Sequence, residues 1–198
     1  MIYILDYGAG NLMNIYNAFK KIRADIKVVN NLKEINKAEG LVIPGVGAFD
    51  PAMKRIGNFT EVIKKLNIPV LGICLGIQLF ATESEESKGK TKGFNIIKGK
   101  VVKFKTNLKV PHMGWNQIKI IKNIPLLEGI KDGDYFYFVH SYYIVPKDKD
   151  DVIATTEYGY KFASIAANKN FYGIQFHPER SGKKGLQILK NFTKMTKC

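Results

Sequence analysis

The 198-residue chain has few cysteines and few histidines, which excludes several classes of protein. It contains two cysteines, Cys74 and Cys198, and three histidines, His112, His140 and His177. Two cysteines so far apart do not make a disulfide framework, and a reactive thiol suits a reducing, cytoplasmic compartment. The histidines are scattered, and none stands at zinc-ligand spacing from another ligand. We therefore expect no metal site, and we predict no cofactor.

Long apolar runs are also missing. No stretch reaches the 18 or more apolar residues that a membrane span needs, so we expect no association with a membrane. The apolar start, Met1–Leu5, is too short for the core of a signal peptide, and Asp6 interrupts it.

Acidic residues are scarce beside basic ones. The chain has 17 acidic and 31 basic residues, which give a net charge of +14 and raise the question of nucleic acid binding. The lysines are spread along the chain, however, and neither a helix-turn-helix nor a ribonucleoprotein motif is present. We interpret most of these lysines as a solvated surface. Attraction of acidic partners or phosphorylated metabolites is the second interpretation, and we expect no nucleic acid partner.

Apolar segments of strand length alternate with helical patterns in the first half of the chain. With 45% hydrophobic residues, a chain of this length buries a substantial core, and we expect one domain over residues 1–198. The alternation predicts parallel βα units joined by right-handed crossovers. The fold class is therefore α/β, in three layers: an open, mostly parallel, twisted sheet with helices on both faces.

The expected elements follow from this reading. In the first half we expect strands over 2–5, 26–29, 41–43 and 70–73, and helices over 12–22, 59–66 and 75–81. The second half is richer in strands, expected over 101–104, 117–121, 135–139, 153–156 and 171–176, and closes with an amphipathic helix over 183–194. The polar segment 83–93 is the expected mobile loop.

Cys74 is the first candidate catalytic residue. It ends an apolar strand and precedes a helical pattern, and Gly72 and Gly76 lie two residues to either side. A side chain on such a sharp strand-to-helix turn is exposed at the edge of the sheet, and glycines let the neighbouring backbone approach it. The helix N-terminus also favours the thiolate. The alternative is an ordinary buried cysteine, but two glycines around an inert core residue would weaken both elements.

A candidate base follows 103 residues later, in His177-Pro178-Glu179 at the end of an apolar strand. The proline favours an extended backbone at His177, and in an extended segment residues two apart point the same way. Glu179 can therefore stay beside the imidazole, fix its tautomer and stabilise its charged form. The tripeptide alone is a weak signal; paired with Cys74 it predicts a Cys-His-Glu triad.

A glycine-rich loop, Pro44–Phe49, follows the expected strand over 41–43. Its backbone N–H groups can turn toward an anion, as those of an oxyanion hole do. An ordinary turn between strand and helix is the alternative, since such turns also favour glycine. A second loop, Tyr7–Asn11, resembles a dinucleotide-binding turn, but Met13 stands where the third glycine belongs, so we reject that function.

Together these motifs resemble those of class I, triad-type glutamine amidotransferases, and the resemblance covers nearly the whole chain. Within that class the chain is most similar to glutaminase subunits of imidazole glycerol phosphate synthase. The narrower resemblance rests on five segments: Asp6–Asn11, Pro44–Phe49, Pro111–Asn116, Phe138–Tyr143 and Gly173–Ser181. Arg180 stands where these proteins usually carry lysine, which keeps the charge but not the hydrogen-bond geometry.

The resemblance implies that the thiolate attacks the side-chain amide of L-glutamine and that His177 handles the protons. It also implies a set of binding residues for the transition state and the substrate. The oxyanion would be held at Gly45, Val46, Gly47 and Leu75, and the amino-acid end of glutamine by Gln78, Glu86, Ser141 and Tyr142. A position one helical turn past Cys74 does place Gln78 beside it.

The resemblance further implies a heterodimer in which ammonia passes through a sealed channel to a (βα)8-barrel cyclase of histidine biosynthesis. The expected interface residues are Asn11, Met113, Trp115 and Arg180. For Met113 and Trp115 core packing is the alternative. Three other functions stay open: the amidotransferase subunit of another synthase, such as one making anthranilate, a thiol hydrolase of a different class, and a scaffold that has lost catalysis.

Overall fold

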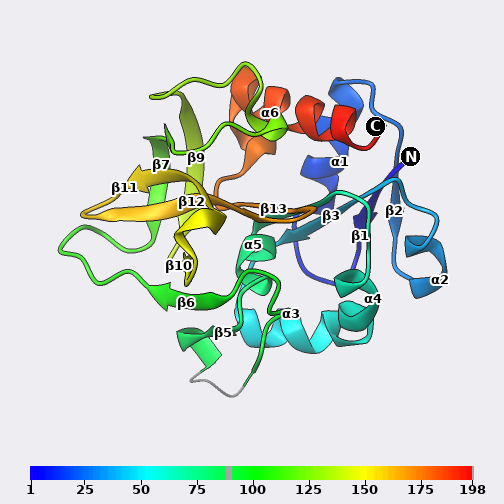
Figure 1. Ribbon diagram of the computed structural model, residues 1–198, viewed down its shortest axis with the longest axis horizontal. Coiled ribbons are helices and arrows are strands. Elements are labelled where there is room, and N and C mark those ends of the chain that lie inside the picture. Colours follow the sequence, from blue (N-terminus) through cyan, green and yellow to red (C-terminus); the bar gives the residue numbers. More distant parts are fainter. Residues whose placement is uncertain (88–90, 198) are drawn as a thin grey trace.

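The computed structural model describes residues 1–87 and 91–197, and its centre is an eight-stranded sheet (Figure 1). The strand order is β2-β1-β3-β4-β13-β12-β11-β8. The bounds are β1 Ile2–Leu5, β2 Ile26–Val29, β3 Gly40–Gly45, β4 Val70–Cys74, β8 Lys119–Ile120, β11 Val152–Glu157, β12 Lys161–Asn168 and β13 Phe171–Ile174. The first five strands in this order, β2, β1, β3, β4 and β13, run parallel. The last three, β12, β11 and β8, each pair antiparallel with the strand before them. The expected α/β class with a mostly parallel sheet is confirmed.

Helices cover both faces of this sheet (Figure 1). They are α1 Leu12–Lys21 and α6 Gly182–Met195 on one face, and α3 Phe49–Ile56, α4 Thr60–Lys64 and α5 Leu75–Leu79 on the other, with the single turn α2 Leu32–Ile35 near β2. Short 3-10 turns are η1 Gly57–Phe59, η2 Glu85–Ser87, η3 Pro125–Leu127, η4 Lys149–Asp151 and η5 Pro178–Arg180.

The parallel strands divide their side chains between two hydrophobic clusters, because successive residues of a strand point to opposite faces. On β1, Ile2 and Ile4 join the cluster that contains residues of α1 and α6. Tyr3 and Leu5 join the cluster that contains residues of α3, α4 and α5. β3 and β4 are buried throughout, as expected of strands covered on both faces.

Two helices of the first half, α2 and α3, are absent from the sequence-based expectations. α3 follows the glycines of the Pro44–Phe49 loop directly and carries Pro51 in its first turn. Proline is tolerated there because the first N–H groups of a helix have no partner within it. The turn-forming residues therefore mask a helical pattern that buries Phe49, Met53 and Ile56.

The second half holds more strands than expected, namely β7 His112–Gln117, β10 Tyr142–Pro146 and β12. The expected strand over 117–121 is wrong as a single element. β7 ends at Gln117 and pairs with β9, Tyr135–His140, whereas β8 pairs with β11. The chain thus changes its pairing partner at Ile118.

Two small sheets stand beside the end of β4. One pairs β7 with β9, and the other has the order β10-β6-β5, with β5 Glu83–Ser84 and β6 Gly99–Lys103. The β9 residue Val139 contacts Cys74, and Gln78 of α5 donates a hydrogen bond to the β10 residue Tyr142. The small sheets therefore form walls around the sharp turn Gly72–Gly76, the elbow that carries Cys74.

The segment 83–93 differs from the expected mobile loop. Residues 83–87 form β5 and η2, and the Gly93 N–H donates to the Thr82 carbonyl at 2.9 Å. Residues 88–90, which also belong to that expectation, lie outside the described residues, as does Cys198.

Candidate active site

Cys74 occupies a strained turn between β4 and α5. Its backbone has φ +54° and ψ −105°, a conformation that costs free energy for a residue with a side chain. The flanking glycines are required by contact: a Cβ on Gly76 would lie 2.1 Å from the Ile43 carbonyl oxygen, and one on Gly72 would lie 2.7 Å from the Gly76 backbone. The close approach that the sequence predicts for this turn is present.

His177 and Glu179 adopt the arrangement that the extended-backbone argument predicts. His177 has φ −97° and ψ 98°, and its Nδ1 atom lies 2.8 Å from Glu179 Oε1. Both side chains are buried, at 6% and 2% exposure. The Ser181 hydroxyl donates to the His177 carbonyl at 2.6 Å, and the His177 N–H donates to the Tyr137 carbonyl at 2.9 Å. The backbone of His177 is therefore held on two sides, and Glu179 holds its imidazole.

The sheet brings this pair to Cys74. β13 lies parallel to β4, with Ile174 opposite Ile73, so the chain leaving β13 reaches the same edge as Cys74. Burial alone would lower the pKa of His177, but the Cys74 thiolate and the Glu179 carboxylate outweigh it and raise that pKa to about 10. At neutral pH the raised pKa favours the imidazolium form of His177. His177 Nε2 has no hydrogen-bond partner within the described residues, which fits a contact that tightens when substrate binds.

The expected oxyanion loop lies against the elbow. Gly45 stands opposite Cys74 across the β3–β4 pairing, and a Cβ on Gly45 would meet the Tyr7 hydroxyl and the Leu75 side chain at less than the contact distance, 2.7 and 2.8 Å. The Tyr7 hydroxyl donates to the Pro44 carbonyl at 2.7 Å. Burial, followed by the neighbouring Cys74, raises the pKa of Tyr7 above its ordinary value, so this donor stays protonated.

A cavity of 330 Å³ opens over the thiol. A pocket of this size holds one small molecule. The lining residues are Val46, Gly47, Cys74, Leu75, Gln78, Glu86, Val139, His140, Ser141, Tyr142 and His177. The lining therefore includes every expected oxyanion and substrate residue except Gly45, the last residue of β3. Glu179 does not line the cavity but contacts His177, which does.

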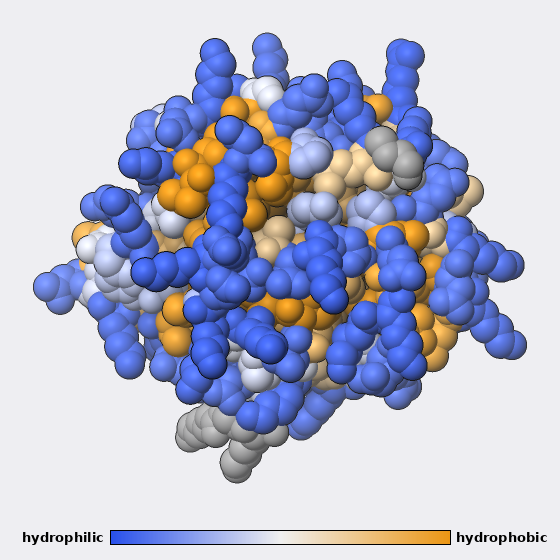
Figure 2. Space-filling model, viewed as in Figure 1, coloured by the Kyte–Doolittle hydropathy of each residue, from blue (hydrophilic) through white to orange (hydrophobic). Residues whose placement is uncertain are grey.

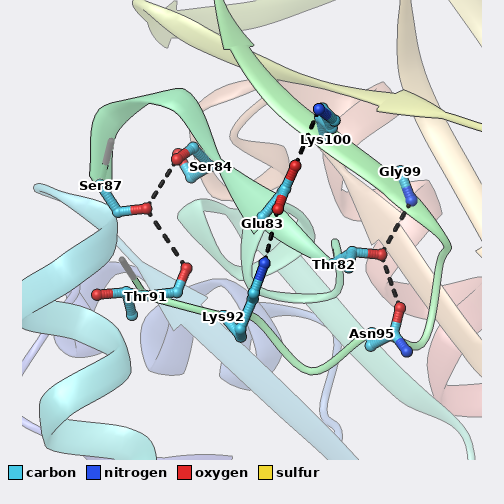
Figure 3. A network of polar contacts seen from close by, with 9 residues as sticks. All are labelled: Thr82, Glu83, Ser84, Ser87, Thr91, Lys92, Asn95, Gly99 and Lys100. Carbon is cyan, nitrogen blue, oxygen red and sulfur yellow. Dashed lines mark hydrogen bonds and ion pairs between the residues drawn. The ribbon is translucent and has the colours of Figure 1, made fainter. Parts of the chain in front are cut away.

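Two features fix the position of Glu86: a hydrogen bond of its carboxylate, and polar contacts that hold the neighbouring residues. Its Oε2 atom accepts from the Phe49 N–H at 2.7 Å, at the start of α3, where the N-cap residue Ala48 provides no side-chain acceptor. Ion pairs and hydrogen bonds staple the surrounding segment (Figure 3): Glu83 with Lys92 and Lys100, Ser87 with Ser84 and Thr91, and Thr82 with Asn95 and Gly99. The carboxylate is thereby placed at the cavity without depending on a long free loop.

Gln78 and Gln175 are buried glutamines that point toward each other. The Gln78 Nε2 atom donates to the Tyr142 carbonyl at 2.9 Å and to Gln175 Oε1 at 3.3 Å. Gln175 Nε2 in turn lies 3.7 Å from the Cys74 sulfur. Gln175, Val139 and His140 were not among the site residues expected from the sequence. The available signal was a glutamine inside an apolar strand, because a buried amide must find polar partners.

Three of the four expected interface residues, Met113, Trp115 and Arg180, lie at the β7–β9 ribbon. Met113 is 62% and Trp115 55% exposed, so the core-packing alternative is wrong for both. In the antiparallel pairing Trp115 faces Tyr137 and Met113 faces Val139, which places all four on the same face. The Arg180 guanidinium lies 4.3 Å from the centre of the Tyr137 ring. Asn11 stands on another element, as the N-cap of α1, where its Oδ1 accepts from the Asn14 N–H.

Neither a metal-binding cluster nor a long apolar helix occurs in the described part of the chain. Residues 1–87 and 91–197 contain no group of three or more histidine, cysteine, aspartate or glutamate side chains placed to hold a metal ion. None of the helices in those ranges has the length and apolarity to cross a membrane. Hydrophilic side chains cover most of the face in Figure 2, with apolar residues visible between them.

The chain is similar to known proteins over nearly its whole length. Residues 3–195 match the family glutamine amidotransferase class-I. The chain is 48% identical to the imidazole glycerol phosphate synthase subunit HisH of Methanocaldococcus jannaschii, over 98% of this chain and all of that protein. It is 47% identical to the subunit of the same name from Archaeoglobus fulgidus, over the full length of both.

Solved structures share the fold at lower identity. A putative GMP synthase subunit from Thermoplasma acidophilum superimposes with a TM-score of 0.77 at 22% identity, covering 99% of this chain and 93% of that one. PurLQS from Thermotoga maritima gives 0.74 at 16% identity, covering 98% and 97%. From the family match and the full-length relatives, the chain belongs to the class I glutamine amidotransferases and, within them, to the family of HisH subunits.

Proposed function

We propose that this chain is the glutaminase subunit of imidazole glycerol phosphate synthase, with the cavity over Cys74 as its active site. The observation that carries the proposal is the convergence at one cavity of a strained nucleophile, a charged histidine and a glycine-rich loop. The chain is 47–48% identical to HisH subunits over 98–100% of its length, which favours this synthase over other synthases whose glutaminase subunits share the fold.

The first half of the reaction uses the ion pair. The Cys74 thiolate attacks the side-chain carbonyl carbon of glutamine, and the negative oxygen is held by N–H groups of Leu75 and of the Gly45-Val46-Gly47 loop. His177 gives its proton to the departing amide nitrogen, and the carbon–nitrogen bond breaks. Ammonia and a thioester between Cys74 and the glutamyl group result.

The second half restores the enzyme. His177, now neutral, takes a proton from water, and the resulting hydroxide attacks the thioester. The carbon–sulfur bond breaks, which releases glutamate and regenerates thiolate and imidazolium. Glu179 holds the imidazole in its productive tautomer throughout, because its carboxylate accepts from Nδ1.

The other cavity residues fix the amino-acid end of the substrate. Glu86 offers a carboxylate to the α-ammonium group, and Gln78, Ser141 and Tyr142 offer polar atoms around it. The α3 N-terminus that Glu86 contacts is positive, which holds this carboxylate in place. Glutamine is thereby bound with its amide toward Cys74.

Ammonia must leave without meeting bulk water, where it would become ammonium. Val139 lies at the cavity, with its carbonyl oxygen 3.9 Å from the Cys74 sulfur, and it stands opposite the exposed Met113. Val139 therefore separates the cavity from the exposed face formed by Met113, Trp115 and Tyr137. We assign this face, with Arg180 and Asn11, to the (βα)8-barrel cyclase, which uses ammonia on a phosphorylated nucleotide to make imidazole glycerol phosphate and an aminoimidazole carboxamide ribotide. We assign the heterodimer to the cytoplasm, because a catalytic thiol must stay reduced.

The loop around Val46 suits control by the partner. Val46 is 46% exposed, and glycines on both sides let its peptide take either of two orientations. A turn of one N–H toward the oxyanion adds a donor of a kind worth about 10²–10³ in rate. The chain alone is thus expected to be a poor glutaminase, which avoids release of unused ammonia.

Glutamine turnover by three samples tests the proposal: the purified chain alone, with the empty cyclase subunit, and with the cyclase loaded with its nucleotide ligand. We expect turnover to rise strongly in the third. Ammonia acceptors of other synthases serve as controls and should give no product. Equal turnover in all three samples would contradict the proposed control through the Val46 loop. Absence of turnover in every sample would contradict the proposed function.

A further inference from the structure

Gln175 lies fully buried between the strand β13 and the catalytic His177. Its backbone N–H donates to the Ser164 carbonyl at 2.9 Å, which continues the strand pairing by one residue. Its side chain turns toward the elbow, and its Nε2 atom lies 3.7 Å from the Cys74 sulfur, within hydrogen-bond distance for sulfur. The mechanism described above uses neither this amide nor its hydrogens.

The orientation of the Gln175 amide follows from its neighbours. A carbonyl oxygen only accepts hydrogen bonds, so the Gln78 atom 2.9 Å from the Tyr142 oxygen must be the amide nitrogen. That nitrogen has a second hydrogen, which it donates to the Gln175 group 3.3 Å away. The accepting group is therefore the oxygen of Gln175, and its NH2 group faces the sulfur.

The two partners of the sulfur suit different protonation states. The Val139 carbonyl oxygen, 3.9 Å from the sulfur, accepts from a thiol S–H but repels a thiolate. The Gln175 N–H stabilises a thiolate and has little to offer a thiol. Cys74 is only 6% exposed, so water provides little solvation for the charge.

We propose that Gln175 is a further catalytic residue, whose amide N–H donates a hydrogen bond to the Cys74 thiolate and stabilises the nucleophile, while Gln78 holds that amide in its donating orientation. The inference rests on the proposed function, since it extends the chemistry of the same thiol. It also gives Gln78 a positioning role in addition to its place at the substrate cavity.

The test measures the pH dependence of Cys74 alkylation by iodoacetamide, without glutamine, with the modified peptide quantified by mass spectrometry. Gln175→Met keeps a side chain of similar length and removes the donor. We expect the midpoint of its profile to rise by about one pH unit, the roughly tenfold effect of one hydrogen bond to a charged group. Gln78→Met should shift the midpoint in the same direction by less, because the donor remains but its orientation is released.

Gln187→Met is the matched control, because Gln187 lies on α6 and its amide bonds only Asn191 among the described residues. Its profile should equal that of the parent chain. If Gln175→Met fails to fold, Gln175→Asn replaces it, since a side chain shorter by one methylene withdraws the amide from the sulfur. A folded Gln175 variant with an unshifted profile overturns the inference. Because no glutamine is present, that outcome is independent of whether the chain hydrolyses glutamine.

Discussion

The Nδ1 atom of His112 lies 3.1 Å from the Nε2 atom of His140, inside the pairing of β7 with β9. Both rings are buried, and their hydrogen bonds permit one neutral arrangement. The Tyr142 carbonyl only accepts, so His140 Nδ1, at 2.8 Å, must donate to it. His140 Nε2 is then the acceptor from His112 Nδ1, and His112 Nε2 accepts from the Asn116 amide at 3.2 Å.

¹⁵N NMR spectra of the histidine side chains test this arrangement. The chain has only three histidines, so each ring can be resolved. Burial lowers the pKa of His112 to about 4 and, as the largest of several causes, that of His140 to about 3, whereas the pKa of His177 is raised to about 10. With ¹⁵N-labelled histidine at pH 7 we expect two neutral rings protonated at Nδ1 and one imidazolium. Three neutral rings would contradict the thiolate–imidazolium pair.

Stability should fall in mild acid. A histidine whose folded pKa lies below the unfolded value of about 6.5 loses its stabilising contribution as the pH falls below that value. His112 and His140 both behave so, and His177, whose folded pKa is raised, offsets only part of the loss. We expect the free energy of unfolding to fall by on the order of 3 kcal/mol from pH 7 to pH 5. Chemical denaturation at both values measures it, and equal stability would contradict buried neutral histidines.

The parts of the fold that were predictable are those in which one local pattern decides. β1, β4 and α6 have apolar runs or periodicity strong enough to set their positions, and the Cys74 turn is marked by its two glycines. β12 was missed because alanines and a buried serine weaken its strand pattern, although pairing on both sides holds it in the sheet.

The candidate site divides in the same way. Cys74, His177 and Glu179 could be proposed from sequence because each stands at a turn whose backbone is set by neighbouring glycine or proline. Gln175 could not, since its contact with Cys74 joins residues 101 positions apart and depends on the order of β4 and β13 in the sheet. Contacts of this kind come from topology, which local patterns do not specify.

Glycine substitutions test the elbow directly. Gly76→Ala puts a Cβ against the Ile43 carbonyl oxygen, where a rigid backbone cannot give way, and should destabilise the fold by about 1–3 kcal/mol or more. Gly57→Ala is the control, because Gly57 has helical angles and no atom within 4 Å of the new Cβ. It should be neutral or stabilising by up to about 1 kcal/mol. Thermal denaturation compares them, and a harmless Gly76→Ala would refute the close approach.

The members of the triad should differ in their effects on glutamine turnover with ligand-loaded partner. His177→Asn removes the proton carrier and should reduce the rate on the order of 10⁴-fold or more. Glu179→Gln leaves the ring in place and weakens only its orientation and charge, so its loss should be at least about tenfold smaller. A Glu179→Gln loss as large as that of His177→Asn would mean that Glu179 does more than orient.

The most direct test of the thioester mechanism compares glutamine and ammonia as nitrogen sources for the assembled synthase carrying Cys74→Ala. We expect glutamine-dependent product formation to disappear, because no sulfur remains to form the thioester, while ammonia-dependent formation at the cyclase stays near the parent rate. Glutamine hydrolysis by Cys74→Ala at a rate close to that of the parent chain would contradict the assignment of Cys74 as the nucleophile.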